Sequence, residues 1–441
     1  MGVALSAARL EAVLARCLAL HPRTIDLSLG RIERLLAALG RPDLRAPPTV
    51  HVAGTNGKGS TLAFLRAILE SAGQTAHAYT SPHLLRFNER ITLSGAPVDD
   101  DRLIDALETC MRVNAGETIT FFEITTAAAF LLFADTKADW LLLETGLGGR
   151  VDATNVLAHP AAAIVTPVSM DHTEFLGETI GAIAREKAGV FKRGAPAIIG
   201  YQSDVARAVL EREARRVGAS VVLANRDFFV REENGRLLYE DESGLMDLPA
   251  PRLFGRHQFE NAATAIAALR KAAPTTSEAA FVKGMRAVVW PARLQPLNAG
   301  RLRGLAPNGA DLWLDGGHNA DGARVAAAAM SALDTRAPAP LVLVCGMLAR
   351  KDARAFLAQF QGLAREMIAV PASGDHEERA PEALVAIARA LGMPACATTT
   401  VDSAFGLLAQ RAWPAPPRIL ICGSLYLAGA TLAADALNPA V

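Results

Sequence analysis

From residue 49 onward, the chain alternates between short apolar runs that end in glycine or polar residues and longer segments whose apolar residues recur at helical spacing. The short runs are rich in β-branched residues and leucine at nearly every position, a pattern typical of parallel strands buried on both faces. The alternation therefore predicts βαβ units. In the first part of the chain we expect strands at 49–53, 140–144, 162–166 and 197–199, and helices at 58–72, 121–136, 178–192, 204–217 and 259–271.

Two segments interrupt this rhythm. Between Asn225 and Leu248 the pattern changes to polar alternation around Asn234-Gly235, a strong hairpin signal, so we expect an antiparallel excursion on the sheet edge. The second interruption is 290–293, the run Trp-Pro-Ala-Arg, after which the alternation resumes. The sequence thus predicts two α/β domains, residues 1–295 and residues 296–441. In the second we expect strands at 311–314, 341–345, 367–370 and 418–422, and helices at 320–333, 353–361, 381–391 and 403–412.

The composition narrows the class of protein. A chain of 441 residues with 51% hydrophobic and 20% charged residues is ordinary for a packed protein of two or three domains. Its 45 basic residues balance 45 acidic ones, so no global field attracts nucleic acid or an anionic membrane surface. The apolar stretches stop short of the roughly 18 to 20 residues that a membrane span needs. We expect small-molecule partners bound at local sites, with no nucleic acid and no membrane.

Two further features predict a cytoplasmic protein. The N-terminal segment is broken by Arg9, Glu11 and Arg16, so we expect an amphipathic helix and not a signal peptide. The five cysteines are odd in number and scattered, with no CxxC pair, which argues against both a disulfide framework and a zinc site. A monomer is the default expectation.

The sharpest chemical feature is the run Gly54-Thr55-Asn56-Gly57-Lys58-Gly59-Ser60, which follows the strand at 49–53 and opens a helix. Glycines let backbone N–H groups approach an anion, the helix N-terminus favours negative charge, and Lys58 adds a point charge for the β- and γ-phosphates. The run departs from the pattern GxxxxGK[ST], because Val52 stands at the first glycine and Gly59 follows the lysine. The alternative is a glycine-rich helix cap that binds nothing.

Polar residues at other predicted strand ends add to this picture. Glu144 ends an apolar run, where a carboxylate points into the crevice in which α/β sheets bind ligands and commonly coordinates the Mg²⁺ of a nucleotide. A salt-bridged strand end is the alternative. His172 follows the strand at 162–166 and is expected on the same rim, although a lone histidine is more often structural. Lys187, Arg293 and Asp315 would each be unremarkable alone.

In this order, the motifs resemble those of the folylpolyglutamate synthase and dihydrofolate synthase family, within the Mur ligase superfamily of ATP-dependent amide-forming enzymes. The resemblance covers nearly the whole chain. It is carried by the segments 24–27, 51–60, 80–84, 86–91, 121–123, 144–155, 171–173, 185–191, 290–295, 314–319 and 423–426.

The resemblance implies an N-terminal P-loop-type parallel-sheet domain that binds ATP and a smaller C-terminal Rossmann-like ligase domain. It places the ATP phosphates on the loop from Gly54 to Ser60, and it gives catalytic roles to Lys58, Glu144, His172 and Lys187. Lys187 would be carbamylated, which requires burial or a nearby cation to lower its pKa. Further nucleotide contacts would come from Asn261, Arg293, Asp315 and His318, and Mg²⁺ would be bound by Ser60, Ser81, Glu144, His172 and Lys187.

The substrates that the resemblance implies are dihydropteroate or a folate, L-glutamate and ATP. ATP would convert the substrate carboxylate into an acyl phosphate, which the amine of glutamate attacks, giving ADP and phosphate. Acyl phosphates hydrolyse, so water must be kept away from the reaction. The pterin-bearing substrate would meet Ile25, Asp26, Leu27, His83, Phe122, Glu123 and Asp152.

Two alternatives stay open. A cell-wall amino-acid ligase of the same superfamily would carry a further domain before the phosphate loop, and 53 residues precede Gly54, which favours the smaller pterin substrate. A P-loop ATPase that serves as a switch would hydrolyse ATP without glutamate. The sequence leaves open which of the two family activities is present, the length of the polyglutamate product and the preferred folate.

Overall fold

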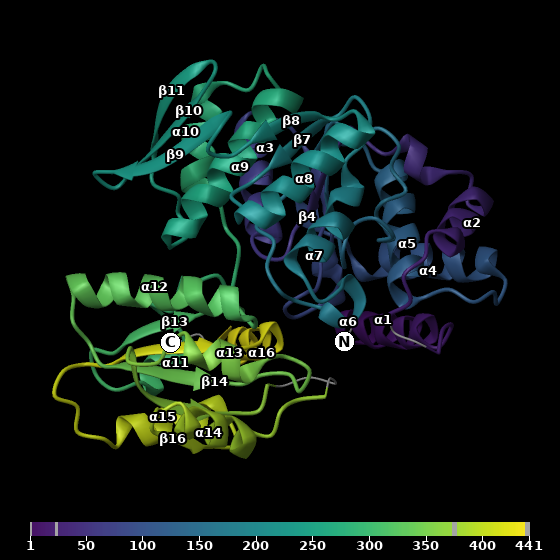
Figure 1. The fold of residues 1–441 in the computed structure, drawn as a ribbon. Coiled ribbons are helices and arrows are strands. Elements are labelled where there is room, and N and C mark those ends of the chain that lie inside the picture. Colours follow the sequence, from purple (N-terminus) through teal and green to yellow (C-terminus); the bar gives the residue numbers. More distant parts are fainter. Residues whose placement is uncertain (1, 23–24, 373–376, 437–441) are drawn as a thin grey trace. The chain divides into compact units, whose positions relative to one another are not determined.

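The computed structural model describes residues 2–22, 25–372 and 377–436, and these form two compact units. The N-terminal unit runs to Arg252 and includes Phe259–Val289. The C-terminal unit consists of Leu253–Gln258 and the chain from Trp290 onward. Both units contain a mainly parallel sheet with helices, so the predicted α/β class is confirmed (Figure 1).

The N-terminal unit is built on an eight-stranded sheet with the order β4-β3-β2-β5-β1-β6-β7-β8. Strands β2, β5, β1, β6, β7 and β8 are parallel, and β3 and β4 are antiparallel at one edge. Because parallel strands end at the same edge of a sheet, the loops after β1, β2, β5 and β6 are neighbours. The strands are β1 (Thr49–Ala53), β2 (Ala76–Tyr79), β3 (Ile91–Leu93), β4 (Ala96–Pro97), β5 (Trp140–Glu144), β6 (Ala162–Val165), β7 (Pro196–Ile199) and β8 (Ser220–Leu223).

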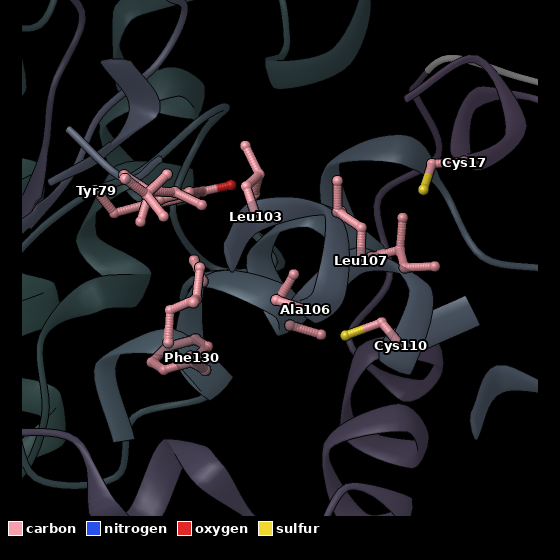
Figure 2. Packing of buried hydrophobic residues seen from close by; sticks show 14 of the residues in the cluster. Cys17, Tyr79, Leu103, Ala106, Leu107, Cys110 and Phe130 are labelled. Carbon is pink, nitrogen blue, oxygen red and sulfur yellow. The ribbon is translucent and has the colours of Figure 1, made fainter. Parts of the chain in front are cut away.

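Helices cover both faces of this sheet, as expected for strands that are apolar at every position. Leu141 and Leu143 of β5 pack in one core with α1, α4 and α5, and Figure 2 shows part of that core around Leu107 and Phe130. Helix α3 packs against α10 so closely that a Cβ on Gly284 would stand 2.6 Å from Ile68 Cγ1. The helices are α1 (Gly2–Leu18), α2 (Gly30–Ala38), α3 (Lys58–Ser71), α4 (Asp100–Asn114), α5 (Phe121–Asp135), α6 (Thr173–Leu176), α7 (Ile180–Lys187), α8 (Asp204–Val217), α9 (Arg256–Ala272) and α10 (Glu278–Ala287).

The polar segment around Asn234-Gly235 forms a separate three-stranded antiparallel sheet of β9 (Phe228–Glu233), β10 (Arg236–Asp241) and β11 (Gly244–Pro249). The predicted hairpin turn is present, with φ of 51° and 71° at its two residues. The expected placement on the edge of the large sheet was wrong. Buried and exposed positions alternate along β10, and its inward residues Leu237 and Tyr239 pack into the core, so this ribbon covers the unit with one face instead of extending the ladder.

The C-terminal unit contains a six-stranded sheet with the order β12-β13-β17-β14-β15-β16, parallel except for β12. Its strands are β12 (Gln295–Pro296), β13 (Asp311–Leu314), β14 (Leu341–Cys345), β15 (Ala364–Ala369), β16 (Ala395–Ala397) and β17 (Arg418–Cys422). Its helices are α11 (Arg301–Leu305), α12 (Ala320–Arg336), α13 (Ala353–Ala358), α14 (Pro381–Ala390), α15 (Val401–Ala409) and α16 (Leu425–Ala436). Across the described ranges of both units, every helix is too short or too polar to cross a membrane.

Candidate active site

The loop from Gly54 to Ser60 leaves the end of β1 and leads into α3, which begins at Lys58. At two positions of this loop, the neighbouring atoms leave no room for a side chain, so only glycine fits. A Cβ on Gly54 would stand 1.9 Å from Thr166 Oγ1, and a Cβ on Gly57 would stand 2.5 Å from Asn261 Oδ1. Both glycines also have positive φ, of 148° and 87°. The loop therefore presents the N-terminus of α3, where backbone N–H groups favour an anion, with Asn261 directly against it.

Lys58 and Glu144 come together at the ends of neighbouring strands. Lys58 Nζ lies 3.8 Å from Glu144 Oε1, and both side chains are largely buried. The other carboxylate oxygen, Oε2, accepts a hydrogen bond of 3.2 Å from the backbone N–H of Ser81, in the loop that follows β2. Three strand ends thus contribute a cation, an anion and a hydroxyl-bearing residue to one place.

Lys187 ends α7 and reaches the same loop. Its ammonium Nζ donates a hydrogen bond of 2.8 Å to the Gly54 carbonyl oxygen. Burial, together with the positive charge of Lys58, lowers the pKa of Lys187 to about 7. A lysine with this pKa is partly neutral at neutral pH, which is the chemical state that reaction with CO₂ requires.

His172 lies on the segment after β6, and this segment is anchored to the phosphate loop. Thr55 Oγ1 donates to the Ser169 carbonyl oxygen and accepts from the Ser169 backbone N–H, both at 3.2 Å, and Asn56 Nδ2 donates to Ser169 Oγ at 3.1 Å. His172 itself has a left-handed backbone, with φ of 50°. The structure thus brings the His172 segment to the loop that carries Lys58.

The donor set near Glu144 suits a hard cation. Among the described residues, no three His, Cys, Asp or Glu side chains lie close enough to hold a metal ion by themselves. A divalent ion at Glu144 would therefore complete its coordination with hydroxyl, phosphate or water oxygens, which are the ligands that Mg²⁺ prefers. Among the predicted residues, Ser81 bonds Glu144 through its backbone N–H, and Ser60 lies in the first turn of α3.

Phe122 and Glu123, two of the residues predicted to meet the pterin-bearing substrate, lie in the first turn of α5. A Cβ on Gly146 would stand 2.4 Å from the ring of Phe122, so this ring lies directly on the turn after β5. Phe121 packs edge-on against Phe87, whose ring also contacts His83. Arg90 Nε donates to His83 Nδ1 at 3.0 Å.

Asp152 shapes the turn that lies against Phe122. Its carboxylate is almost fully buried and accepts hydrogen bonds from the backbone N–H groups of Leu147 and Thr154 at 2.7 and 3.0 Å, and from Thr154 Oγ1 at 2.6 Å. Thr154 Oγ1 also contacts His51 Nε2 at 2.8 Å. Burial raises the pKa of Asp152, against these hydrogen bonds, and lowers the pKa of His51 to about 3, so His51 is neutral.

In the C-terminal unit, the loop after β13 brings together the three nucleotide contacts predicted there. Asp315 accepts hydrogen bonds from the backbone N–H groups of Leu294 and Gly317 at 2.9 and 2.8 Å, and burial raises its pKa. A Cβ on Gly316 would stand 3.0 Å from Arg293 Nη1, and His318 Nδ1 lies 3.2 Å from the Gly316 carbonyl oxygen.

Sequence reasoning missed several residues that hold these side chains in place. Arg31 bonds both Asp26 and Glu123, Thr166 braces the phosphate loop, and Arg90 orients His83. Thr120 could have been found, because Thr120 and Glu123 form the pattern S/T-x-x-E of a capping box, and both of its hydrogen bonds are present. Arg31 lies 92 positions from Glu123, and Thr166 lies 110 positions from Asn56, so no local pattern marks these two contacts.

Comparison with known proteins adds the family. Residues 52–269 match the Mur ligase middle domain, and residues 300–425 match the Mur ligase glutamate ligase domain. The folylpolyglutamate synthase of Lacticaseibacillus casei is 34% identical over 419 residues, which cover 91% of this chain and 92% of that protein. The dihydrofolate synthase/folylpolyglutamate synthase of Escherichia coli is 32% identical over 425 residues, covering 92% and 91%.

Solved structures agree with these relatives. Escherichia coli FolC in complex with DHPP and ADP superposes with a TM-score of 0.89 at 30% identity, covering 99% of each chain. The bifunctional folylpolyglutamate synthase/dihydrofolate synthase of Yersinia pestis, complexed with AMPPNP and Mn ion, gives 0.85 at 30% identity, covering 96% and 97%. The resemblance drawn from the motifs is thereby confirmed: the chain belongs to the folylpolyglutamate synthase/dihydrofolate synthase family of Mur ligases.

Proposed function

We propose that this chain is an ATP-dependent ligase that joins L-glutamate to dihydropteroate, to the glutamate tail of folates, or to both. The observation that carries the proposal is the meeting of Lys58, Glu144 and Lys187 at one phosphate loop in a chain of this family. The relatives support the ligands: the Escherichia coli structure holds DHPP and ADP, and a further related structure has Mn, AMPPNP and L-glutamate bound.

The proposed reaction is the one that the family resemblance implies. A substrate carboxylate attacks the γ-phosphorus of ATP, ADP leaves, and the acyl phosphate that forms is attacked by the glutamate amine with loss of phosphate. The N-terminus of α3 and Lys58 hold and neutralise the phosphates, so that catalysis rests on positioning and charge. Glu144, with Ser60, Ser81 and His172, would hold Mg²⁺, which supplies further neutralisation of the phosphate charge when bound.

The remaining site residues complete the proposal. Gly54 to Ser60 would bind the ATP phosphates, and Asn261, Arg293, Asp315 and His318 would contact the nucleotide. Lys187 would act as a carbamate. Residues 1–295 would bind ATP and 296–441 would serve as the ligase domain. The pterin-bearing substrate would meet Ile25, Asp26, Leu27, His83, Phe122, Glu123 and Asp152.

We also propose that the protein acts as a monomer in the cytoplasm. Its five cysteines are free thiols and four are buried, which suits a reducing compartment. Light scattering after size-exclusion chromatography would measure the mass of the particle, and a mass of twice the chain's 46.5 kDa would contradict the monomer.

An isotope experiment tests the central step. With ¹⁸O in the carboxylate of dihydropteroate, the released phosphate must carry ¹⁸O, because the acyl phosphate breaks at its C–O bond. ATP consumption must also require L-glutamate, and hydrolysis without glutamate would favour the ATPase switch instead. Assays with dihydropteroate and tetrahydrofolate side by side decide between the two activities.

A further inference from the structure

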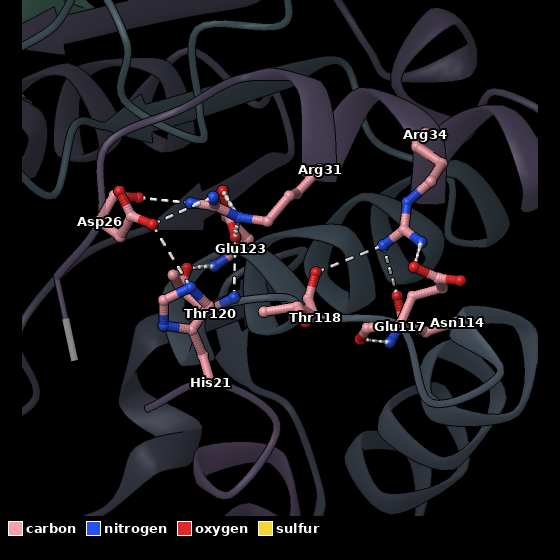
Figure 3. Close-up of polar contacts among 9 residues, drawn as sticks. All are labelled: His21, Asp26, Arg31, Arg34, Asn114, Glu117, Thr118, Thr120 and Glu123. Atoms are coloured by element: carbon pink, nitrogen blue, oxygen red, sulfur yellow. Dashed lines mark hydrogen bonds and ion pairs between the residues drawn. The ribbon is translucent and has the colours of Figure 1, made fainter. Parts of the chain in front are cut away.

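Arg31, on α2, bonds two segments that are far apart in the sequence (Figure 3). Its Nε lies 2.9 and 3.2 Å from the two carboxylate oxygens of Glu123 at the start of α5. Its Nη1 donates to Asp26 Oδ2 at 3.2 Å, and its Nη2 donates to the Asp26 carbonyl oxygen at 2.6 Å. One guanidinium thus holds both the segment before α2 and the first turn of α5.

The burial of Glu123 makes the contact selective for arginine. The Glu123 side chain is 4% exposed, and its Oε2 also accepts from the Thr120 backbone N–H at 2.7 Å. A buried carboxylate that loses its cation is costly, so Glu123 depends on Arg31. The planar guanidinium donates in two directions at once. The point charge of lysine cannot bond Glu123 together with the Oδ2 and the carbonyl oxygen of Asp26.

What Arg31 holds in place is the predicted pterin contact region. Phe122 is adjacent to Glu123 and lies on the turn at Gly146, while Ile25 and Leu27 flank Asp26. His21 Nε2, 3.4 Å from Asp26 Oδ2, supports the same carboxylate from the other side. Arg31 therefore fixes the distance between the segment 25–27 and the first turn of α5, the two parts of the chain that would bind the substrate.

We propose that Arg31 is a positioning residue that sets the affinity for the pterin-bearing substrate by acting through Asp26 and Glu123. This inference rests on the proposed function. The guanidinium orders the two segments before substrate arrives, so its loss weakens substrate binding and leaves the phosphate loop and its contacts with ATP unchanged.

The chain offers a matched control one turn along the same helix. Arg34 Nη2 donates to Asn114 Oδ1 at 3.0 Å, and Arg34 Nη1 lies 3.3 Å from Glu117 Oε2 (Figure 3). These contacts tie α2 to the connection between α4 and α5, as Arg31 ties α2 to α5, but they involve none of the predicted substrate residues.

The test compares Arg31→Lys, Arg31→Met and Arg34→Met for melting temperature, for kcat and KM with each substrate, and for equilibrium binding of dihydropteroate without ATP. We expect Arg31→Lys to raise the KM and the dissociation constant of dihydropteroate about tenfold or more, the effect of losing a charge-assisted hydrogen bond. The KM of ATP should change less than about twofold. Arg34→Met should lower the melting temperature without raising the KM of dihydropteroate.

An unchanged KM of dihydropteroate in Arg31→Lys, or an equal rise in Arg34→Met, would overturn the inference. Arg31→Lys keeps the charge and is the decisive variant if Arg31→Met does not fold. Asp26→Asn and Arg31→Lys should also be non-additive, and additive effects would show that Arg31 does not act through Asp26. A wild-type protein that neither binds dihydropteroate nor needs it for ATP turnover would instead refute the proposed function.

Discussion

The amine of Lys187 shows how strongly burial changes one functional group. With a pKa of about 7, roughly half of this amine is neutral at pH 7, whereas an ordinary lysine would be neutral in about one molecule per 3,000. Carbamylation would replace its positive charge, next to Lys58, by a negative one. This exchange turns a group that repels a metal ion into one that attracts it.

We predict that Lys187→Ala keeps the fold and loses most of its turnover, at least about a hundredfold, and that bicarbonate does not restore activity. With ¹³C-labelled bicarbonate, NMR should detect a carbamate in the wild-type protein that is missing from the variant. Wild-type activity in Lys187→Ala would contradict a catalytic role for the residue.

The same pKa predicts how stability depends on pH. Folding lowers the pKa from 10.5 to about 7, so between these values the unfolded chain binds the additional proton and stability rises with pH. Lys187→Met removes this effect. In CO₂-free buffer, the variant should be more stable than the wild type near pH 6, and its advantage should shrink by up to about 1.4 kcal/mol per pH unit above pH 7. Urea unfolding at several pH values measures the difference in stability between the variant and the wild type. A difference that grows with pH would refute the lowered pKa of Lys187.

At the scale of elements, predictions were accurate where the sequence signal is local. The strands expected at 49–53, 140–144, 311–314, 341–345 and 418–422 have those bounds, because apolar residues predominate in each short run. The helix expected at 178–192 ends at Lys187 instead, since the chain then packs so closely that a Cβ on Gly189 would stand 2.2 Å from Arg150 Cα. Strand β2, Ala-His-Ala-Tyr, escaped prediction because it is short and contains no β-branched residue or leucine.

The residues of the candidate site likewise fall into those that the sequence predicts and those that only the fold reveals. The glycine loop and the strand-end acid Glu144 are visible in the sequence, because their chemistry depends on neighbours along the chain. The bond from Arg31 to Glu123 spans 92 positions, and that from Lys187 to Gly54 spans 133, so only the fold reveals them.

The junction of β1 and α3 yields a prediction for Gly54→Ala. The new Cβ would clash with Thr166 Oγ1, so we expect a loss of stability of about 1–3 kcal/mol and weakened ATP binding. Gly73→Ala is the matched control, because Gly73 also has positive φ, of 79°, but open space around it. Thermal unfolding and nucleotide titration measure both effects, and equal behaviour of the two variants would mean that backbone strain alone matters.

At the scale of the whole molecule, balanced charge leaves the binding of an anionic nucleotide to local groups, above all Lys58. The free energy of that binding adds directly to the stability of the folded chain.

We therefore predict that Mg-AMPPNP at about 100 times its dissociation constant stabilises the protein by about 2.7 kcal/mol, and that Lys58→Met loses most of this gain at the same nucleotide concentration. The exposed Lys137→Met should keep it. Differential scanning calorimetry measures the shift. Equal stabilisation of Lys58→Met and the wild type would remove Lys58 from the nucleotide site.

The paired bonds between Thr55 and Ser169 have one more consequence. They join the loop after β1 to the segment after β6. A displacement of the phosphate loop on nucleotide binding would therefore also displace the segment that carries His172. The position of His172 would then depend on whether a nucleotide is bound at the phosphate loop, and the Thr55 hydroxyl would couple the two. In Thr55→Val, the phosphate loop and the segment that carries His172 would respond to nucleotide independently.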